Sequence, residues 1–427
     1  MNIKIMEYKV KCEKLDYRGY GIVKDLGKVG FIKGLLPSEE AIIKVTLDKK
    51  NYFEGEIVNL LTRSNDRSNH EILYDNNSLI HLESLKQLYF QKEITLETFI
   101  RNGITNFKKE EIIHNKNFFN YRNKALFFVV NDPYLKLGGY KEGSRIFSEI
   151  DNLKLVEPAI NKVLKELNTY YKLKNIYYED LSSIVIRSNY LEEVMVIFVT
   201  NSKKNIPKEL YKPLVDNEKI VSIYQNYKDN EKRNVGSKNV LIAKEKYLID
   251  KIGDFKFVIY PNSFFQVNRD IAYLTYEKIK TLFDGNDIVI DAFAGISSIG
   301  QFISKKVKQV YSIEIDDDSV LSAKESIKLN NIKNLEIVKG DFNSEFDKYK
   351  YKGNTLIIDP PRQGISDKVI NLINDSNMNK IIYLSCNLKT LVRDLKLLTN
   401  YEVISITPIK MFYQTVEMET LVYLKKI

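Results

Sequence analysis

A cysteine at the end of an apolar run is the residue of this chain best suited to covalent chemistry. Cys386 follows KIIYLS and precedes the polar stretch NLK. A thiolate is a strong nucleophile, and a strand–loop junction beside a cofactor would suit it. A lone cysteine is more often an inert core residue, so this prediction depends on the neighbouring motifs. Cys12 has no such motif and is predicted to be structural.

An aspartate followed by two prolines ends another apolar run. The segment NTLIIDPPRQGI places Asp359 before Pro360 and Pro361. Two prolines stiffen a loop and donate no ladder hydrogen bonds, so Asp359 is predicted to project from a rigid support. A strand-terminating turn without any function would have the same pattern.

A glycine turn and two acidic residues follow three further apolar runs. Phe293 and Gly295 lie in DAFAGISSIG, where the glycine permits a tight turn and close approach of a ligand. Glu314 ends the next run and suits ribose hydroxyls, and Asp341 ends the third, where an adenine amino group is expected. The G-x-G-x-x-G spacing is absent, and this order favours S-adenosylmethionine (SAM) over NAD.

Three blocks of sequence would position these residues. Residues 1–65 alternate apolar and polar residues between glycine turns, which predicts five short strands in a small OB-like β-barrel. Residues 66–255 are predicted to form an α+β domain, with loops over 201–240. Residues 256–427 alternate strands and helices, which predicts an α/β, Rossmann-like, doubly wound parallel sheet with its ligand at the carboxyl ends of the strands.

Composition narrows the chemistry further. Two cysteines and three histidines in 427 residues argue against a disulfide framework, an all-cysteine cluster and a histidine-based metal site. No run approaches a membrane span, and no signal peptide is evident, so a cytoplasmic location is expected. The net charge of +9 suits a nucleic-acid partner without requiring one.

Together these residues resemble the RNA uracil-C5 methyltransferases, SAM-dependent enzymes that make 5-methyluridine in ribosomal or transfer RNA. The resemblance covers nearly the whole chain, and the N-terminal block is similar to a TRAM domain, an OB-like RNA-binding module. The segments that carry it, in the family's order, are YRNK (Tyr121–Lys124), PNSFFQVN, DAFAGISSIG, DPPRQGI, LSCNLKTLVRDL and MFYQTVEMETLVYL.

The resemblance implies a role for each site residue. Cys386 would add to C6 of uracil, and Glu419 would remove the C5 proton as general base. Glu417 is the alternative base, at a position where this family often has a histidine. Asp359 would lie between cofactor and base. The remaining SAM contacts would come from Gln266, Phe293, Gly295 and Glu314, with Asp341 near the adenine.

Two departures from the family pattern affect these expectations. Many members carry a cysteine cluster for an iron–sulfur centre after the barrel, but residues 63–88 contain no cysteine, so no cluster is predicted. Ser297 stands where the SAM loop usually has its second glycine. The local geometry of that loop is therefore an open question.

Several alternatives remain at this stage. The TRAM-like block favours 23S ribosomal RNA as substrate, and transfer RNA is the alternative. Amino-group methyltransferases also use a DPP motif, but with an aromatic residue where Arg362 stands here. An RNA cytosine-C5 methyltransferase typically has a proline–cysteine pair at that motif. A non-catalytic RNA-binding protein with a degenerate methyltransferase domain is the other class of answer. A monomer is the default expectation.

Overall fold

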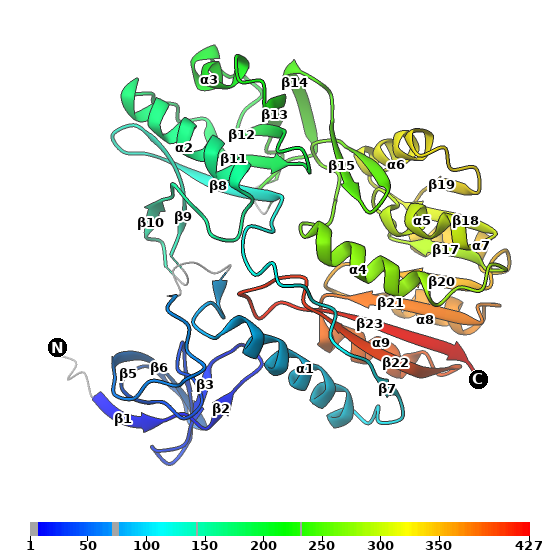
Figure 1. Ribbon diagram of the computed structural model, residues 1–427, viewed down its shortest axis with the longest axis horizontal. Coiled ribbons are helices and arrows are strands. Elements are labelled where there is room, and N and C mark those ends of the chain that lie inside the picture. The colour runs from blue at the N-terminus through cyan, green and yellow to red at the C-terminus, as the bar shows by residue number, and fades with distance from the viewer. Residues whose placement is uncertain (1–6, 71–76, 142–143, 231–232) are drawn as a thin grey trace. The chain divides into compact units, whose positions relative to one another are not determined.

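The computed structural model describes residues 7–70, 77–141, 144–230 and 233–427, which form two compact units (Figure 1). The first unit comprises Met1–Thr98, Lys141–Ser144 and Phe412–Met418, and the second comprises Phe99–Tyr140, Arg145–Met411 and Glu419–Ile427. Among the described residues, no helix has the length and apolar character needed to cross a membrane.

The first unit is built on a six-stranded sheet, one strand more than expected from the turns. Its order is β1-β5-β6-β4-β3-β2, and β2 has only two residues. Cys12, Val23, Ile43 and Phe53 lie in its core. The strands are β1 (Glu7–Lys11), β2 (Lys14–Leu15), β3 (Gly21–Val23), β4 (Val29–Ile32), β5 (Glu40–Asp48) and β6 (Tyr52–Leu60).

Helix α1 (Ser84–Arg101) holds the segment Phe412–Met418 within this unit. The side chain of Gln87 donates to Gln414 Oε1 at 2.7 Å and accepts from the Gln414 backbone N–H at 3.0 Å. Gln91 Nε2 donates to the carbonyl of Thr415 at 3.1 Å. The chain immediately before Glu419 is therefore fixed by buried amide side chains.

The second unit contains an eight-stranded sheet in the order β19-β18-β17-β20-β21-β23-β22-β7. The strands from β19 to β21 are parallel, as predicted, but β23 is antiparallel to β21 and to β22. These strands are β7 (Lys108–Lys109), β17 (Ile288–Ala292), β18 (Gln309–Glu314), β19 (Leu335–Lys339), β20 (Thr355–Ile358), β21 (Lys380–Ser385), β22 (Tyr401–Ile409) and β23 (Glu419–Lys426).

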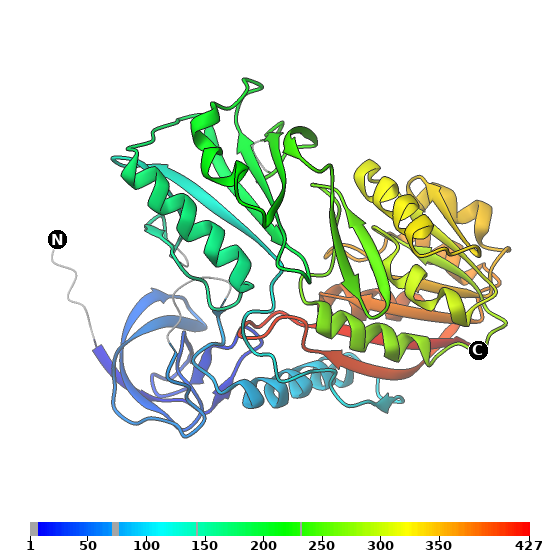
Figure 2. The same ribbon diagram turned by 45° about the horizontal axis from the view of Figure 1, so that its top comes forward.

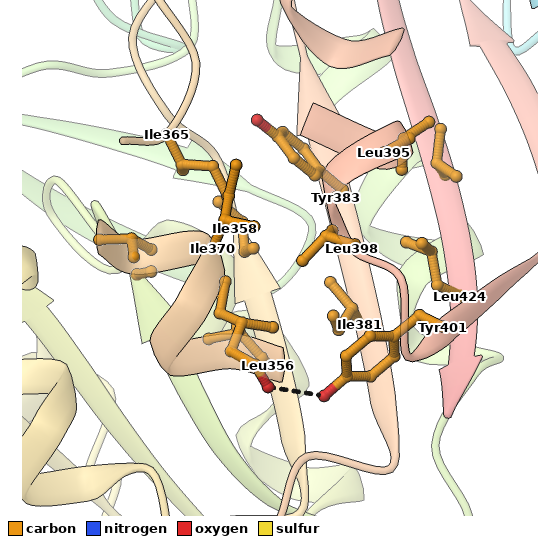
Figure 3. Packing of buried hydrophobic residues seen from close by; sticks show 14 of the residues in the cluster. Leu356, Ile358, Ile365, Ile370, Ile381, Tyr383, Leu395, Leu398, Tyr401 and Leu424 are labelled. Atoms are coloured by element: carbon orange, nitrogen blue, oxygen red, sulfur yellow. Dashed lines mark hydrogen bonds between the residues drawn. The ribbon is translucent and has the colours of Figure 1, made fainter. Parts of the chain in front are cut away.

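Helices cover both faces of this sheet (Figure 1). On one face lie α4 (Arg269–Lys280), α5 (Ser298–Ile303) and α6 (Asp317–Leu329), and on the other lie α7 (Phe342–Tyr349), α8 (Asp367–Asn374) and α9 (Leu388–Leu397). Figure 3 shows the second layer, where Ile370 lies beside Ile358 and Leu398 lies near Ile381 and Tyr383. This is the Rossmann-like arrangement that the strand–helix alternation predicts.

A seven-stranded sheet, β10-β9-β8-β11-β12-β13-β14, precedes it in the same unit. Helix α2 (Pro158–Leu173) packs on one of its faces (Figure 2). The expectation of loops over 201–240 is wrong, because β13 (Ile220–Tyr227) lies inside this sheet. The remaining elements are β8 (Lys124–Asn131), β9 (Leu135–Tyr140), β10 (Phe147–Glu149), β11 (Leu181–Ser188), β12 (Val194–Thr200), η2 (Lys208–Leu210), α3 (Lys212–Val215), β14 (Lys238–Lys244), the hairpin β15 (Leu248–Ile252) and β16 (Phe255–Ile259), and η3 (Ser304–Lys306).

Candidate active site

The glycine loop follows β17 at the carboxyl end of the sheet. Gly295 has φ +53°, a left-handed conformation that glycine adopts at little cost. Its backbone N–H donates to Glu314 Oε2 at 2.7 Å. Glu314 Oε1 accepts the N–H groups of Ile315 and Asp316, both at 2.8 Å. Glu314 therefore shapes the glycine loop, and its carboxylate stands at the strand end where a ribose is expected.

Ser297, where the resemblance predicts a second glycine, has a left-handed backbone conformation. Its φ is +56°, so it carries the backbone strain that a glycine would avoid. Its hydroxyl is hydrogen-bonded to Ser312 Oγ at 2.7 Å, and Ser312 in turn donates to Asp291 Oδ2 at 3.1 Å. This buried network holds Ser297 in the strained conformation.

A pocket of about 320 Å³, part of it open to solvent, lies against this loop. Four of the predicted cofactor residues, Gln266, Phe293, Gly295 and Asp359, line it. The others that line it are Phe264, Asp291, Ala294, Ile296, Ser298 and Ile299. Glu314 and Asp341 are not among them. Asp341 is exposed, and its Oδ1 accepts the Asn343 N–H at 2.9 Å to cap α7.

The YRNK segment holds the pocket wall that contains Gln266. Asn123 donates from Nδ2 to the carbonyl of Gln266 at 3.0 Å, and its backbone N–H donates to the carbonyl of Val267 at 3.0 Å. Asn123 is only 4% exposed, so these bonds are shielded from water. The sequence reveals the motif, but its role in positioning Gln266 becomes visible only in the fold.

Cys386 follows β21 and precedes α9, close to two carboxyl groups. Burial raises the pKa of the Cys386 thiol, and the charges of Glu419 and Asp359 raise it further. The guanidinium of Arg362 acts in the opposite direction. The fold thus brings the predicted nucleophile within electrostatic range of the predicted base and of the DPP aspartate.

Glu419 is the first residue of β23 and lies opposite Ile409 of β22. Its Oε2 atom is buried and accepts no hydrogen bond from the described residues. Burial raises the pKa of this carboxyl, and the neighbouring Asp359 raises it further. Glu417 is half-buried in the segment held by α1, where its carbonyl accepts from Gln91 Nε2 at 3.3 Å.

Comparisons with known proteins identify the family. Residues 87–427 match the family described as tRNA (Uracil-5-)-methyltransferase. The chain belongs to this family. An uncharacterized RNA methyltransferase of Fusobacterium nucleatum is 32% identical over 436 residues, which cover 96% of this chain and 94% of the relative. Another of Bacillus cereus is 31% identical over 447 residues, which cover 98% and 96%.

A solved structure shares the fold over nearly the whole length of this uracil-5-methyltransferase family member. It is the tRNA (uracil-54, C5)-methyltransferase of Pyrococcus abyssi in complex with S-adenosyl-L-homocysteine, with a TM-score of 0.81 and 22% identity. The likeness covers 97% of this chain and 99% of that one. At this identity it supports the fold, including the Rossmann-like catalytic domain.

Side chains of α9 fix the loop that follows Asp359 in this methyltransferase. Arg393 Nη2 donates to the carbonyl of Gln363 at 2.9 Å. Asp394 Oδ2 accepts both the Ile365 N–H at 3.0 Å and the Tyr383 hydroxyl at 2.6 Å. Because Asp394 is fully buried, this connection between loop, helix and strand β21 is rigid.

One residue that lines the pocket of this methyltransferase has no role predicted from the sequence. Asp291 is the penultimate residue of β17, is 1% exposed and lines the pocket. Burial raises its pKa to about 7, against the opposing effect of the Ser312 hydrogen bond. The signal was present, because Asp291 is the first residue of DAFAGISSIG at a predicted strand end.

The structure also describes most of residues 63–88, the cysteine-free stretch for which the sequence predicts no iron–sulfur cluster. Within residues 7–70, 77–141, 144–230 and 233–427, no group of three or more histidine, cysteine, aspartate or glutamate side chains is arranged to hold a metal ion. Residues 71–76 of the cysteine-free stretch lie outside the described residues. Cys12 is buried and Cys386 partly exposed, and neither forms a disulfide.

Proposed function

We propose that this protein transfers a methyl group from SAM to C5 of a specific uridine in RNA, with Cys386 as nucleophile and Glu419 as general base. One observation carries the proposal: a partly exposed thiol interacts electrostatically with two carboxyl groups, one of which, Asp359, lines the pocket. Glu419 is preferred to Glu417 because its Oε2 is buried without a hydrogen bond from the described residues.

The pocket residues fit SAM. An added Cβ at Gly295 would come no closer than 4.0 Å to a neighbouring atom, so the space above the loop is open to a ligand. Glu314 would accept hydrogen bonds from ribose hydroxyls, and Asp359 would lie between cofactor and base. Bound there, SAM supplies an electrophilic methyl group. The role of Asp341 near the adenine rests on the sequence alone.

The reaction needs covalent catalysis because C5 of uracil is a weak nucleophile. Cys386, having lost its proton to water, forms the Sγ–C6 bond and pushes electron density to C5. C5 then bonds to the methyl carbon as the carbon–sulfur bond of the donor breaks. Glu419 takes the C5 proton, and the Sγ–C6 bond breaks to restore the aromatic ring. The target uridine must be flipped out of its stack to reach Cys386.

We propose 23S ribosomal RNA as the substrate, on the basis of the TRAM-like N-terminal β-domain. Transfer RNA is the second candidate, because the family description and the Pyrococcus relative both name it. Purified 23S RNA and tRNA from a strain that lacks the gene should be digested and their 5-methyluridine measured. Loss from 23S RNA supports the first candidate, loss from tRNA the second, and loss from neither contradicts uridine methylation.

The covalent step is tested with RNA that contains 5-fluorouridine, which cannot release a C5 proton. The wild-type protein with SAM should form an adduct that survives denaturing electrophoresis, and Cys386→Ala should form none. Cys12→Ala removes the other sulfur and serves as the control, since Cys12 is buried and is not one of the residues that line the pocket. Methyl transfer to uridine by Cys386→Ala would contradict the mechanism.

A further inference from the structure

Two positive side chains face each other on neighbouring strands beside the pocket wall. Lys124 of β8 pairs directly with Arg187 of β11 in the antiparallel register. Side chains at directly opposed positions share a face of the sheet, and like charges placed this way destabilise it. Within the described part of the chain, Lys124 Nζ makes no hydrogen bond or ion pair.

Arg187 is buried with part of its hydrogen-bonding capacity unused. It is 4% exposed, its Nη2 donates to the carbonyl of Ser263 at 2.6 Å, and its Nε has no partner among the described residues. A buried donor without an acceptor is costly, so an acceptor supplied by a ligand would be favourable. The positive charge of the pair and the unused Nε donor of Arg187 both favour binding of an anion.

Nearby acids do not neutralise this pair. Asp250 and Asp318 act on Arg187 only at longer range. Asp250 Oδ2 is bound to Arg269 at 2.8 Å, and Asp318 Oδ2 accepts the Asn262 N–H at 3.2 Å. The charge of Arg187, together with burial, lowers the pKa of Lys124 to about 7.

The pair lies next to the residues that line the pocket. Ser263, the acceptor for Arg187, precedes Phe264, whose ring lines the pocket and is 60% exposed. Asn123, which precedes Lys124, holds Gln266 in place. An anion bound by this pair would therefore sit beside the site where the base must enter.

Aromatic rings continue along the same sheet face. Phe128 lies four residues after Lys124 on β8, hence on the same face and about 13 Å away. Its ring centroid is 5.3 Å from that of Tyr140, which is 5.8 Å from that of Phe147. Tyr140 is 40% exposed, so unstacked bases can pack on this cluster.

We propose that Lys124 and Arg187 bind a backbone phosphate of the RNA beside the target uridine. This inference rests on the proposed function and adds the contact that orients the RNA strand. A phosphate would separate the two positive charges and accept hydrogen bonds from both side chains. The neighbouring rings favour RNA over the carboxylate of SAM as the source of the anion.

Lys124→Gln tests the proposal against Lys165→Gln, which removes an exposed charge from α2 on the opposite sheet face. The probe is a fluorescein-labelled, single-stranded 15-mer of oligouridine, titrated at several salt concentrations. Lys124→Gln should bind it about fivefold more weakly, and the slope of log K against log salt should shrink by about 0.7. Lys124→Arg should restore both quantities, and Lys165→Gln should match the wild type.

The stability of Lys124→Gln toward urea distinguishes phosphate binding by Lys124 from a purely structural role. Lys124→Gln removes a repulsion, so it should raise the urea midpoint of unfolding while it weakens RNA binding. A lowered midpoint with an unchanged salt slope would overturn the phosphate site. Weaker binding of S-adenosylhomocysteine, measured by calorimetry, would assign the anion to the cofactor and would also overturn it.

Replacing one RNA phosphate with an uncharged methylphosphonate tests which phosphate Lys124 and Arg187 bind. A single methylphosphonate next to 5-fluorouridine should slow adduct formation by the wild type more than by Lys124→Gln, which keeps only the contact from Arg187. Equal slowing in both proteins would contradict the inference. Failure of the proposed function is distinguishable, because it would appear as absence of 5-methyluridine with the wild-type protein, whatever Lys124 does.

Discussion

The side-chain amide of Asn387 donates to the backbone carbonyl of Arg362 at 3.0 Å, so the residue after Cys386 holds the loop after Asp359. The same side chain accepts the Lys389 N–H at 3.1 Å as the N-cap of α9. The predicted nucleophile and the DPP loop therefore move as one body. A site that must place a thiol, a methyl donor and a base together depends on such support.

Loss of this link should reduce activity more than stability. Asn387→Ala should lower kcat by roughly tenfold to a hundredfold, because sub-ångström misplacement is costly in such sites. Loss of the cap should cost about 1 kcal/mol of unfolding free energy. Ser366→Ala removes the corresponding cap of α8 and should cost similar stability with little effect on kcat. Equal kcat values in the two variants would argue against the positioning role.

Ligand binding should require Gly295 because of its left-handed backbone conformation. Ala at φ +53° costs about 1–2 kcal/mol and would tilt the loop that lines the pocket. Gly295→Ala should therefore weaken S-adenosylhomocysteine binding by about tenfold in calorimetry. Gly285→Ala is the matched control, because Gly285 has φ +99° and nothing within 4 Å. It should lose stability but bind the ligand normally; weakened binding there would mean that general destabilisation explains both.

Substitutions at Ser297 separate backbone strain from hydrogen bonding. Ser297→Gly relieves the left-handed strain but loses the bond to Ser312, and the two effects, each about 1 kcal/mol, should nearly cancel. Ser297→Ala keeps the strain and loses the bond, so it should be less stable by about 1–3 kcal/mol. Urea denaturation measures both. If the glycine variant is as unstable as the alanine variant, strain does not matter at this position.

The buried carboxyl of Glu419 should make stability depend on pH. Its pKa is raised from the ordinary 4.5, mainly by burial, so the folded protein holds the proton more tightly than the unfolded chain does. Its favourable contribution is complete below pH 4.5 and is lost as pH rises through the raised value. Glu419→Gln should therefore match the wild type at pH 4 and be more stable at pH 9, as denaturant unfolding would report. Equal stability at both pH values would contradict a buried, poorly solvated base.

The methyl-transfer rate should increase with pH, whereas the contribution of Glu419 to stability decreases. The base works as a carboxylate and Cys386 as a thiolate, and both pKa values are raised, so the methyl-transfer rate should increase from pH 6 to pH 9. Single-turnover rates with tritiated SAM measure this directly. A rate that is flat over this range would mean that neither group titrates in the reacting complex.

Local pattern was sufficient for much of the catalytic domain. The alternation of apolar runs with helical segments predicts its strands from β17 onward, and Asp359 and Gly295 line one pocket, whereas Asp341 does not. The antiparallel direction of β23 cannot be predicted from ETLVYL. The residue pattern of an apolar strand buried on both faces is the same whether the strand is parallel or antiparallel to its neighbours. Strand β13 was missed because IVSIYQNY carries polar residues, whose partners, such as the Glu245 carbonyl for Ser222, come from elsewhere in the sheet.

The candidate site also contains some residues that the sequence could place and some contacts that it could not. Gly295 and Glu314 could be placed from their positions after strands, because the carboxyl ends of parallel strands meet. The pairing of Lys124 with Arg187 depends on a strand register set by the whole sheet, which no local pattern encodes. The strain carried by Ser297 is likewise visible only in the backbone.

The contrast between the two thiols makes the protein a ready reporter of its own site. Cys12 is 2% exposed, and burial raises its pKa to about 12, so it remains protonated and inaccessible. Cys386 is partly exposed and interacts electrostatically with Asp359, which lines the pocket. A maleimide fluorophore would therefore label one position in the unmodified chain, and its emission would follow the arrival of RNA and cofactor without any engineered cysteine.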